Sequence, residues 1–169
     1  MQSATPAPTD TDTVVSATVV EHHRLRHDLA VVRLECSDGI VPFRAGQYVD
    51  VTVPQHPNLP RRLSPALPPS MDGKLEFHVR AVPGGWVSGA IVADTKVGQV
   101  WSIGAARGGD LHIDDTGRIV IMIAGGTGLA PLRALILDTA RRAPRARGIR
   151  VCRPWTVAAR ARVGAAGWG

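Results

Sequence analysis

One short stretch in the C-terminal half constrains the fold more than any other. Residues 119–124 form an apolar run of strand length, the glycines Gly125, Gly126 and Gly128 follow, and residues 129–136 then repeat apolar side chains at helical spacing. This order predicts a buried strand, a tight turn and the N-terminus of a helix. The free backbone N–H groups and the helix dipole at such a turn favour an anion. Taken alone, the turn fits a plain strand–helix connection as well as a phosphate site.

The turn differs from the common G-x-G-x-x-G dinucleotide fingerprint in two respects. Pro131 stands where the third glycine would be, a position in the first helical turn that tolerates proline. The acidic residue expected about 20 positions further on is missing, because Asp138 is the last acid in the chain. The sequence therefore predicts a dinucleotide site of a less common kind.

The charges are divided unevenly along the chain. Residues 1–140 contain 12 lysines and arginines against 14 acids, whereas residues 141–169 contain eight arginines and no acid. The body has no basic face with interleaved aromatic residues, so nucleic-acid binding is supported only weakly, through the arginine-rich tail. The two cysteines, Cys36 and Cys152, indicate neither a metal site nor a disulfide framework.

Nothing in the sequence resembles a membrane or export segment. No apolar run is long enough to span a bilayer, and residues 1–12 lack the charged and apolar regions of a signal peptide. Their content of Thr, Pro and Ala predicts a disordered lead-in. We therefore expect a cytoplasmic protein without a membrane partner.

Residues 13–83 alternate between apolar and polar side chains in short runs. Strands are expected at 13–20, 30–36, 48–53 and 75–82, with Gly- and Pro-rich turns between them. A helix at 86–94 and short strands at 100–103 and 111–113 complete the region. Many short strands separated by turns predict a small antiparallel barrel.

Four segments of this region carry candidate ligand groups. They are Gly46-Gln47-Tyr48, Arg61-Arg62-Leu63-Ser64, His78-Val79-Arg80 and Gly84-Gly85-Trp86-Val87-Ser88. Adjacent arginines suit a phosphate, and a glycine turn that opens a helix forms a second anion site. Each segment also has a plain structural interpretation. Tyr48 would be a core or surface tyrosine, and residues 61–64 a solvated loop. His78 and Arg80 would form the polar face of an edge strand, and residues 84–88 an ordinary helix start with Trp86 in the core.

The order and spacing of these segments, followed by the glycine turn at 125–131, resemble the ferredoxin–NADP reductase superfamily. The resemblance covers residues 14–142 and is closest to the FAD- and NAD(P)-binding reductase module of flavohaemoglobins. It implies an antiparallel Greek-key FAD-binding β-barrel at 13–114, followed by the first strand–helix unit of a nicotinamide-nucleotide-binding lobe at 117–152. The implied activity is hydride transfer from NAD(P)H to FAD, with electrons passed to a haem, an iron–sulfur centre or oxygen. A globin-type partner upstream would suit such a module.

The resemblance also implies roles for individual residues. Arg61 would bind the flavin pyrophosphate, and Ser64 would hydrogen-bond near the reactive nitrogen of the flavin. Leu63 stands where the family has a tyrosine, so it can pack on the ring but cannot donate a hydrogen bond. The other implied FAD contacts are Tyr48, Arg62, His78, Val79, Arg80, Gly84, Gly85, Trp86, Val87 and Ser88. The implied nicotinamide-cofactor contacts are Gly125, Gly126, Thr127, Gly128, Leu129, Ala130 and Pro131. Ser64 and Thr127 are the two predicted catalytic residues, and no metal site is predicted.

The resemblance stops within the nicotinamide lobe. Such a lobe continues through further strand–helix units of roughly 30 residues each, but here one unit and a second strand at 148–152 are expected. Ala, Arg, Gly and Pro supply 19 of the 27 residues from 143 onward, and no periodicity fits. We therefore expect a C-terminally truncated lobe with an irregular basic tail at 153–169, and a frameshift or premature stop is one hypothesis for it.

An incomplete lobe has two consequences. A parallel strand needs cover on both faces, so the strand at 119–124 should keep an apolar face uncovered. An FAD-binding fragment with little or no nicotinamide-dependent activity is then the main alternative function, and a degenerate fragment without function is the other.

Overall fold

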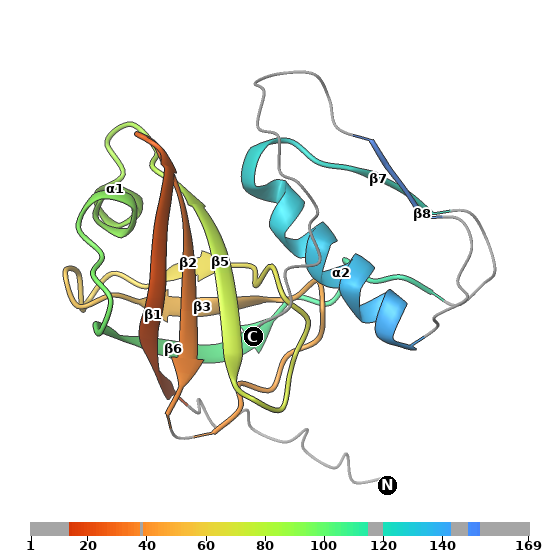
Figure 1. Cartoon of the computed structure of the whole chain (residues 1–169), viewed down its shortest axis with the longest axis horizontal. Coiled ribbons are helices and arrows are strands. Elements are labelled where there is room, and N and C mark those ends of the chain that lie inside the picture. Colours follow the sequence, from red (N-terminus) through yellow and green to blue (C-terminus); the bar gives the residue numbers. More distant parts are fainter. Residues whose placement is uncertain (1–13, 38, 115–119, 143–148, 153–169) are drawn as a thin grey trace, which may run out of the picture.

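The computed structural model describes residues 14–37, 39–114, 120–142 and 149–152 (Figure 1). The first region, called the barrel here, contains β1 (Val15–Arg26), β2 (Leu29–Cys36), β3 (Tyr48–Thr52), β4 (Arg61–Leu63), β5 (Lys74–Arg80), α1 (Trp86–Ala93) and β6 (Val100–Arg107). The second region, called the second lobe, contains β7 (Val120–Ile123), the 3-10 turn η1 (Gly126–Gly128), α2 (Leu129–Arg142) and β8 (Ile149–Cys152). The lead-in at 1–12 and the tail at 153–169 lie outside the described residues.

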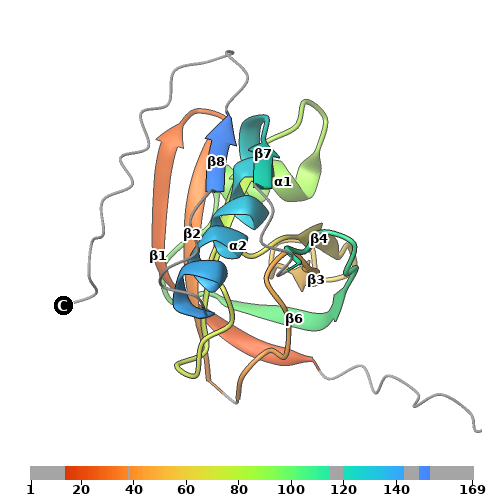
Figure 2. The same cartoon turned by 90° about the vertical axis from the view of Figure 1, so that its right-hand side faces the viewer.

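The six strands of the barrel form one antiparallel sheet in the order β4-β3-β6-β1-β2-β5. Figures 1 and 2 show β1, β2 and β5 crossing β3, β4 and β6 as two layers. The two ends of the sheet meet where the Ala66 N–H, just after β4, donates to the Glu76 carbonyl oxygen on β5 at 2.7 Å. The non-sequential order and this closure agree with the expected Greek-key barrel.

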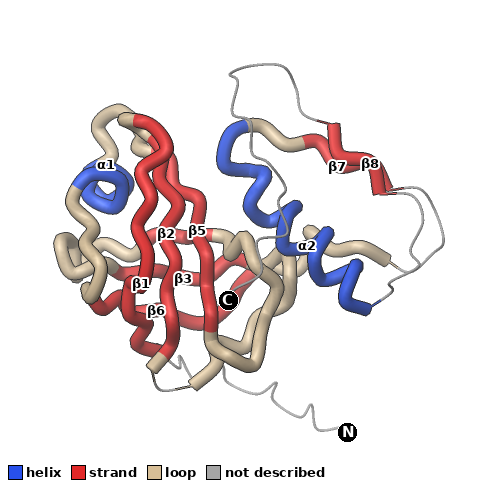
Figure 3. The backbone as a smooth tube through the Cα atoms, viewed as in Figure 1, coloured by secondary structure: helices blue, strands red, loops and turns tan. Residues whose placement is uncertain are grey.

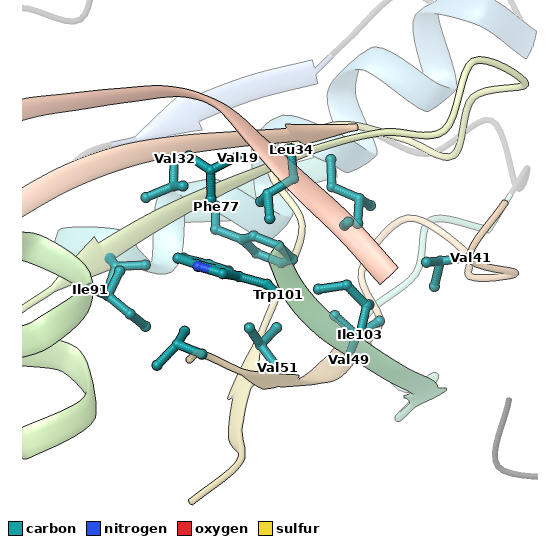
Figure 4. Packing of buried hydrophobic residues seen from close by; sticks show 14 of the residues in the cluster. Val19, Val32, Leu34, Val41, Val49, Val51, Phe77, Ile91, Trp101 and Ile103 are labelled. Carbon is teal, nitrogen blue, oxygen red and sulfur yellow. The ribbon is translucent and has the colours of Figure 1, made fainter. Parts of the chain in front are cut away.

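Alternating side chains build the barrel core, as their period predicts. Leu75, Phe77 and Val79 of β5 point inward and are at most 3% exposed. Phe77 lies against Trp101 of β6 in the centre of the core (Figure 4). One side of the barrel is covered by α1, whose buried residues include Ile91.

The second lobe is built around α2, which packs on both the barrel and β7 (Figures 1 and 3). Strands β7 and β8 pair in parallel. Met122 of β7 is buried with Leu132 and Leu135 of α2, but Ile121 and Ile123 on the opposite face of β7 are 66% and 72% exposed. The expectation of an uncovered apolar face is therefore confirmed.

Two details of the expected secondary structure were wrong. Residues 111–113 form no strand, because β6 extends to Arg107 and the chain then turns so that the Leu111 carbonyl lies against Gly46. The segment Arg61–Leu63 is a strand, β4, and not a solvated loop, because it pairs with β3. Within the part of the chain described here, no helix is long and apolar enough to cross a membrane.

Candidate functional site

Strand β4 carries the paired arginines at one edge of the barrel. Leu63 lies opposite Val49 and Arg61 lies opposite Val51 in the antiparallel register. Opposed residues point to the same side of a sheet, so Arg61 and Leu63 share the inner face with two fully buried valines. Leu63 packs partly against the core, whereas Arg61 is exposed and donates to the Pro60 carbonyl oxygen at 2.9 Å. Arg61 therefore presents an exposed guanidinium at the barrel edge.

The outer face of β3 and β4 holds the second arginine and the tyrosine. The Arg62 guanidinium carbon is 5.4 Å from the centroid of the Tyr48 ring, and its Nε is 3.8 Å from Asp50 Oδ1. Asp50 also accepts a hydrogen bond from Arg107 Nε at 3.2 Å. An open depression of about 320 Å³ lies on this face, but none of its lining residues is a predicted cofactor ligand. The structure thus places Tyr48 and Arg62 together and separates both from the inner face that holds Arg61.

The glycine turn before α1 exposes the start of that helix. Gly84 has a φ of +75°, and Gly85 precedes the helix without a side-chain cap. The first N–H groups, at Trp86 and Val87, have no acceptor within the helix. Ser88 Oγ donates to the Gly85 carbonyl oxygen at 3.2 Å, so the hydroxyl stabilises the turn itself. Trp86 is 73% exposed and Val87 is buried, so the interpretation of the tryptophan as a core residue was wrong.

Strand β5 lies at the end of the sheet order, and His78 and Arg80 are among the polar side chains of its outer face, with the buried Val79 between them in sequence. His78 Nε2 lies 3.0 Å from Glu76 Oε1. Arg80 Nε donates to Asp28 Oδ2 at 3.0 Å. This face of β5 is polar, but it is not the ordinary solvated face of an edge strand, because Glu76 on the same face is 3% exposed.

Glu76 is a buried acid surrounded by basic side chains from three elements. Its Oε2 accepts a hydrogen bond from Arg33 Nε of β2 at 2.8 Å, while its Oε1 lies 3.0 Å from His78 Nε2 and 3.1 Å from Arg133 Nη1 of α2. Burial alone would raise the pKa of Glu76, but the hydrogen bonds from His78 and Arg33 and the charge of Arg133 lower this pKa to about 2. The carboxylate is therefore ionised at neutral pH.

The glycine turn of the second lobe meets the barrel at Arg80. Gly126 has a φ of +55°, and a methyl group on it would lie 3.6 Å from Arg80 Nη1. Thr127 is half-buried in η1, and Gly125 and Gly128 on either side face open space. The predicted nicotinamide turn and the predicted flavin strand are thus brought side by side (Figure 1). The remaining predicted contacts, Leu129, Ala130 and Pro131, form the first turn of α2.

Two residues of this junction were missed by sequence reasoning. Glu76 alternates with apolar neighbours and looks like any solvent-facing acid of a strand, yet it is 3% exposed. Arg133 looks like a surface residue of a helix, but its Nη1 donates to the Ala66 carbonyl oxygen at 2.8 Å. No local pattern signals either contact, because the partners are distant in the sequence.

Known proteins match this chain over the barrel and over most of its length. The sequence model of the oxidoreductase FAD-binding domain family matches residues 16–110. The electron transfer component XylA of xylene/toluene monooxygenase from Pseudomonas putida is 34% identical over 134 residues, which cover 79% of this chain and 37% of XylA. The chain thus spans little more than a third of that relative's length.

Solved structures show the same fold. The ferredoxin reductase in carbazole 1,9a-dioxygenase superposes with a TM-score of 0.76 at 28% identity, covering 86% of this chain and 44% of that one. The flavohaem-like FAD/NAD-binding domain of nitric oxide dioxygenase from Vibrio cholerae has a TM-score of 0.68 at 20% identity, covering 82% and 61% respectively. The latter likeness concerns the fold alone.

Proposed function

The chain belongs to the oxidoreductase FAD-binding domain family, and we propose that it is the flavin module of an NAD(P)H-dependent electron-transfer reductase. When bound, FAD would accept a hydride from the nicotinamide and release electrons to an acceptor. Among the predicted acceptors an iron–sulfur protein is favoured, because the similar proteins are a ferredoxin reductase and the electron transfer component of a monooxygenase. A haem or oxygen acceptor, a globin-type partner and a cytoplasmic location remain predictions.

The residues at the barrel edge suit a flavin dinucleotide. Arg61 supplies an exposed guanidinium, and the start of α1 supplies N–H groups at Trp86 and Val87 for a pyrophosphate. Ser64 is half-buried directly after β4, so its hydroxyl can bind a polar ring edge. Leu63 keeps a partly exposed apolar surface for the ring. This donor set matches the negative charge of the phosphates and the mixed polarity of a flavin.

One contact supports nicotinamide-dependent activity in addition to flavin binding. Gly126, in the turn proposed for the nicotinamide cofactor, lies against Arg80 of the strand proposed for the flavin. Two sites that must exchange a hydride have to meet, because the reacting atoms must come within about 3–3.5 Å of each other. In this proposal Ser64 orients the flavin, Thr127 orients the nicotinamide, and Arg80 marks the boundary between them.

An absorbance spectrum of the purified protein, followed by anaerobic addition of NADH and then NADPH, tests the proposal. We expect bound flavin whose visible absorbance bleaches with one of the two nucleotides. Two matched variants accompany this test. Arg61→Gln removes the predicted phosphate ligand and should weaken FAD binding, and Arg107→Gln, which alters an arginine of the outer face, is its control. Absence of flavin after incubation with FAD would contradict the proposal.

The second candidate function is FAD binding without nicotinamide turnover. It is favoured by the second lobe, whose described part contains two strands and one helix and leaves Ile121 and Ile123 exposed. The same titration separates the two functions. Bound flavin that neither nucleotide bleaches would support the second candidate, and bleaching would exclude it.

A further inference from the structure

We propose that Arg133 is a positioning residue that couples the flavin-binding edge of the barrel to the second lobe, an inference that rests on the proposed function. Arg133 lies on α2, and its Nη1 reaches the barrel at two points. It donates to the Ala66 carbonyl oxygen at 2.8 Å and lies 3.1 Å from Glu76 Oε1. One guanidinium thus holds the helix to both ends of the barrel sheet.

Both contacts lie next to predicted flavin ligands. Ala66 follows Ser64 by two residues, and its N–H donates to the Glu76 carbonyl oxygen at 2.7 Å. His78 lies two residues after Glu76 on the same face of β5, and its Nε2 is 3.0 Å from the carboxylate oxygen that Arg133 approaches. A displacement of His78 by a ligand would therefore reach Arg133 through the Glu76 carboxylate. A displacement of Ser64 would reach it along the chain through the Ala66 carbonyl.

The barrel does not need Arg133 to keep Glu76 paired. Arg33 Nε holds the other carboxylate oxygen at 2.8 Å, and His78 remains beside the first. Removal of Arg133 therefore leaves a buried carboxylate with two partners, which avoids the large cost of an isolated buried charge. We expect the loss of Arg133 to loosen α2 while the barrel stays folded.

Coupling of this kind acts in both directions. A ligand that fixes the segments around Ser64 and His78 also fixes the acceptors of Arg133, so α2 should become better ordered. By linkage, a helix held in place by Arg133 raises the affinity for the ligand by the same factor. Because α2 directly follows the glycine turn at Gly126, its order sets where the second cofactor lies relative to the first.

The test compares Arg133→Met and Arg133→Lys with the unchanged protein. Amide hydrogen exchange of α2 peptides is measured by mass spectrometry with and without FAD, and the FAD dissociation constant is measured by fluorescence quenching. We expect FAD to slow exchange in α2 of the unchanged protein. In Arg133→Met, α2 should exchange faster even without FAD, and the dissociation constant should rise about fivefold or more. Arg133→Lys keeps the charge but loses the planar fork of the guanidinium. Its α2 exchange and its FAD dissociation constant should lie between those of the unchanged protein and Arg133→Met.

Arg142→Met is the matched control. Arg142 lies on the same helix but pairs with Asp138 of that helix, Nε to Oδ2, at 2.9 Å, so its loss should change neither FAD affinity nor exchange. Exchange in β1 and β2 should stay constant in all variants if the barrel remains folded. Failure of the unchanged protein to bind FAD would overturn the proposed function and the coupling together. Flavin binding that is equally tight in Arg133→Met and Arg142→Met, or an α2 that FAD leaves unaffected, would overturn the coupling alone.

Discussion

The barrel and the second lobe are stabilised in different ways. Trp101 and Phe77 of the barrel are fully buried among inward-facing side chains of five strands and α1. Among the described residues, the buried cluster of the second lobe contains five members, and one of them, Ala45, belongs to the barrel. Ile121 and Ile123 are left exposed on the far face of β7. The comparison shows that the barrel carries its own core, whereas the second lobe depends on the barrel for part of its packing.

The largest expected effect is the loss of the barrel core. Trp101→Ala should lower the free energy of unfolding by about 3–5 kcal/mol, because it opens a large cavity. Trp101→Phe should cost much less, because the indole N–H has no hydrogen-bond partner among the described residues. Urea denaturation followed by far-UV circular dichroism measures both. Met122→Ala, in the second lobe, should leave this transition in place and speed amide exchange in α2 only. An equal effect of Trp101→Ala and Met122→Ala on the unfolding transition would contradict the conclusion that the barrel carries its own core.

The next effect concerns Glu76, which joins the two regions. Its pKa of about 2 lies below the ordinary value of 4.5, so the unfolded chain binds its proton first as the pH falls. The stabilisation is therefore complete above about pH 4.5 and disappears as the pH approaches 2, with a full size of about 3 kcal/mol. Denaturation curves between pH 7 and pH 2 measure the loss. Glu76→Gln should show a smaller loss over this range, and an unchanged pH profile in this variant would show that other carboxylates cause it.

The barrel was far easier to predict from the sequence than the site that it carries. Strand β5 is evident because apolar and polar side chains alternate along it, which gives the residues a period of two. Strand β4 is three residues long and follows prolines, so no period could reveal it. Residues 111–113 alternate as a strand would, but no strand in the described part of the chain pairs with them. The contact of Arg80 with Gly126 depends on how distant segments pack, which alternation and turn residues do not encode.

A single glycine at the junction of the two regions should have the next largest effect. A methyl group at Gly46 would lie 1.9 Å from the Leu111 carbonyl oxygen, and the φ of this residue is +94°. Gly46→Ala should therefore destabilise the protein by about 2 kcal/mol or more, since the left-handed backbone strain alone accounts for roughly 1–2 kcal/mol. Gly98→Ala separates the two causes, because Gly98 has a φ of +90° with open space around it. Equal losses in thermal denaturation would mean that the collision is relieved by movement of the 111–113 segment.

The smallest expected effect on stability concerns the exposed face of β7, and it tests directly how the second lobe differs from the barrel. Ile123 is 72% exposed on β7, so Ile123→Lys should change the free energy of unfolding by no more than about 0.5 kcal/mol. The same substitution should reduce self-association, measured by light scattering over a range of protein concentrations, because it places a charge in an exposed apolar face. Met122→Lys is the control, since Met122 is 4% exposed on the opposite face and a charge there should release α2 from β7. If Ile123→Lys loosened α2 as much as Met122→Lys does, the outer face of β7 would be covered in solution, and the second lobe would depend on more than the barrel.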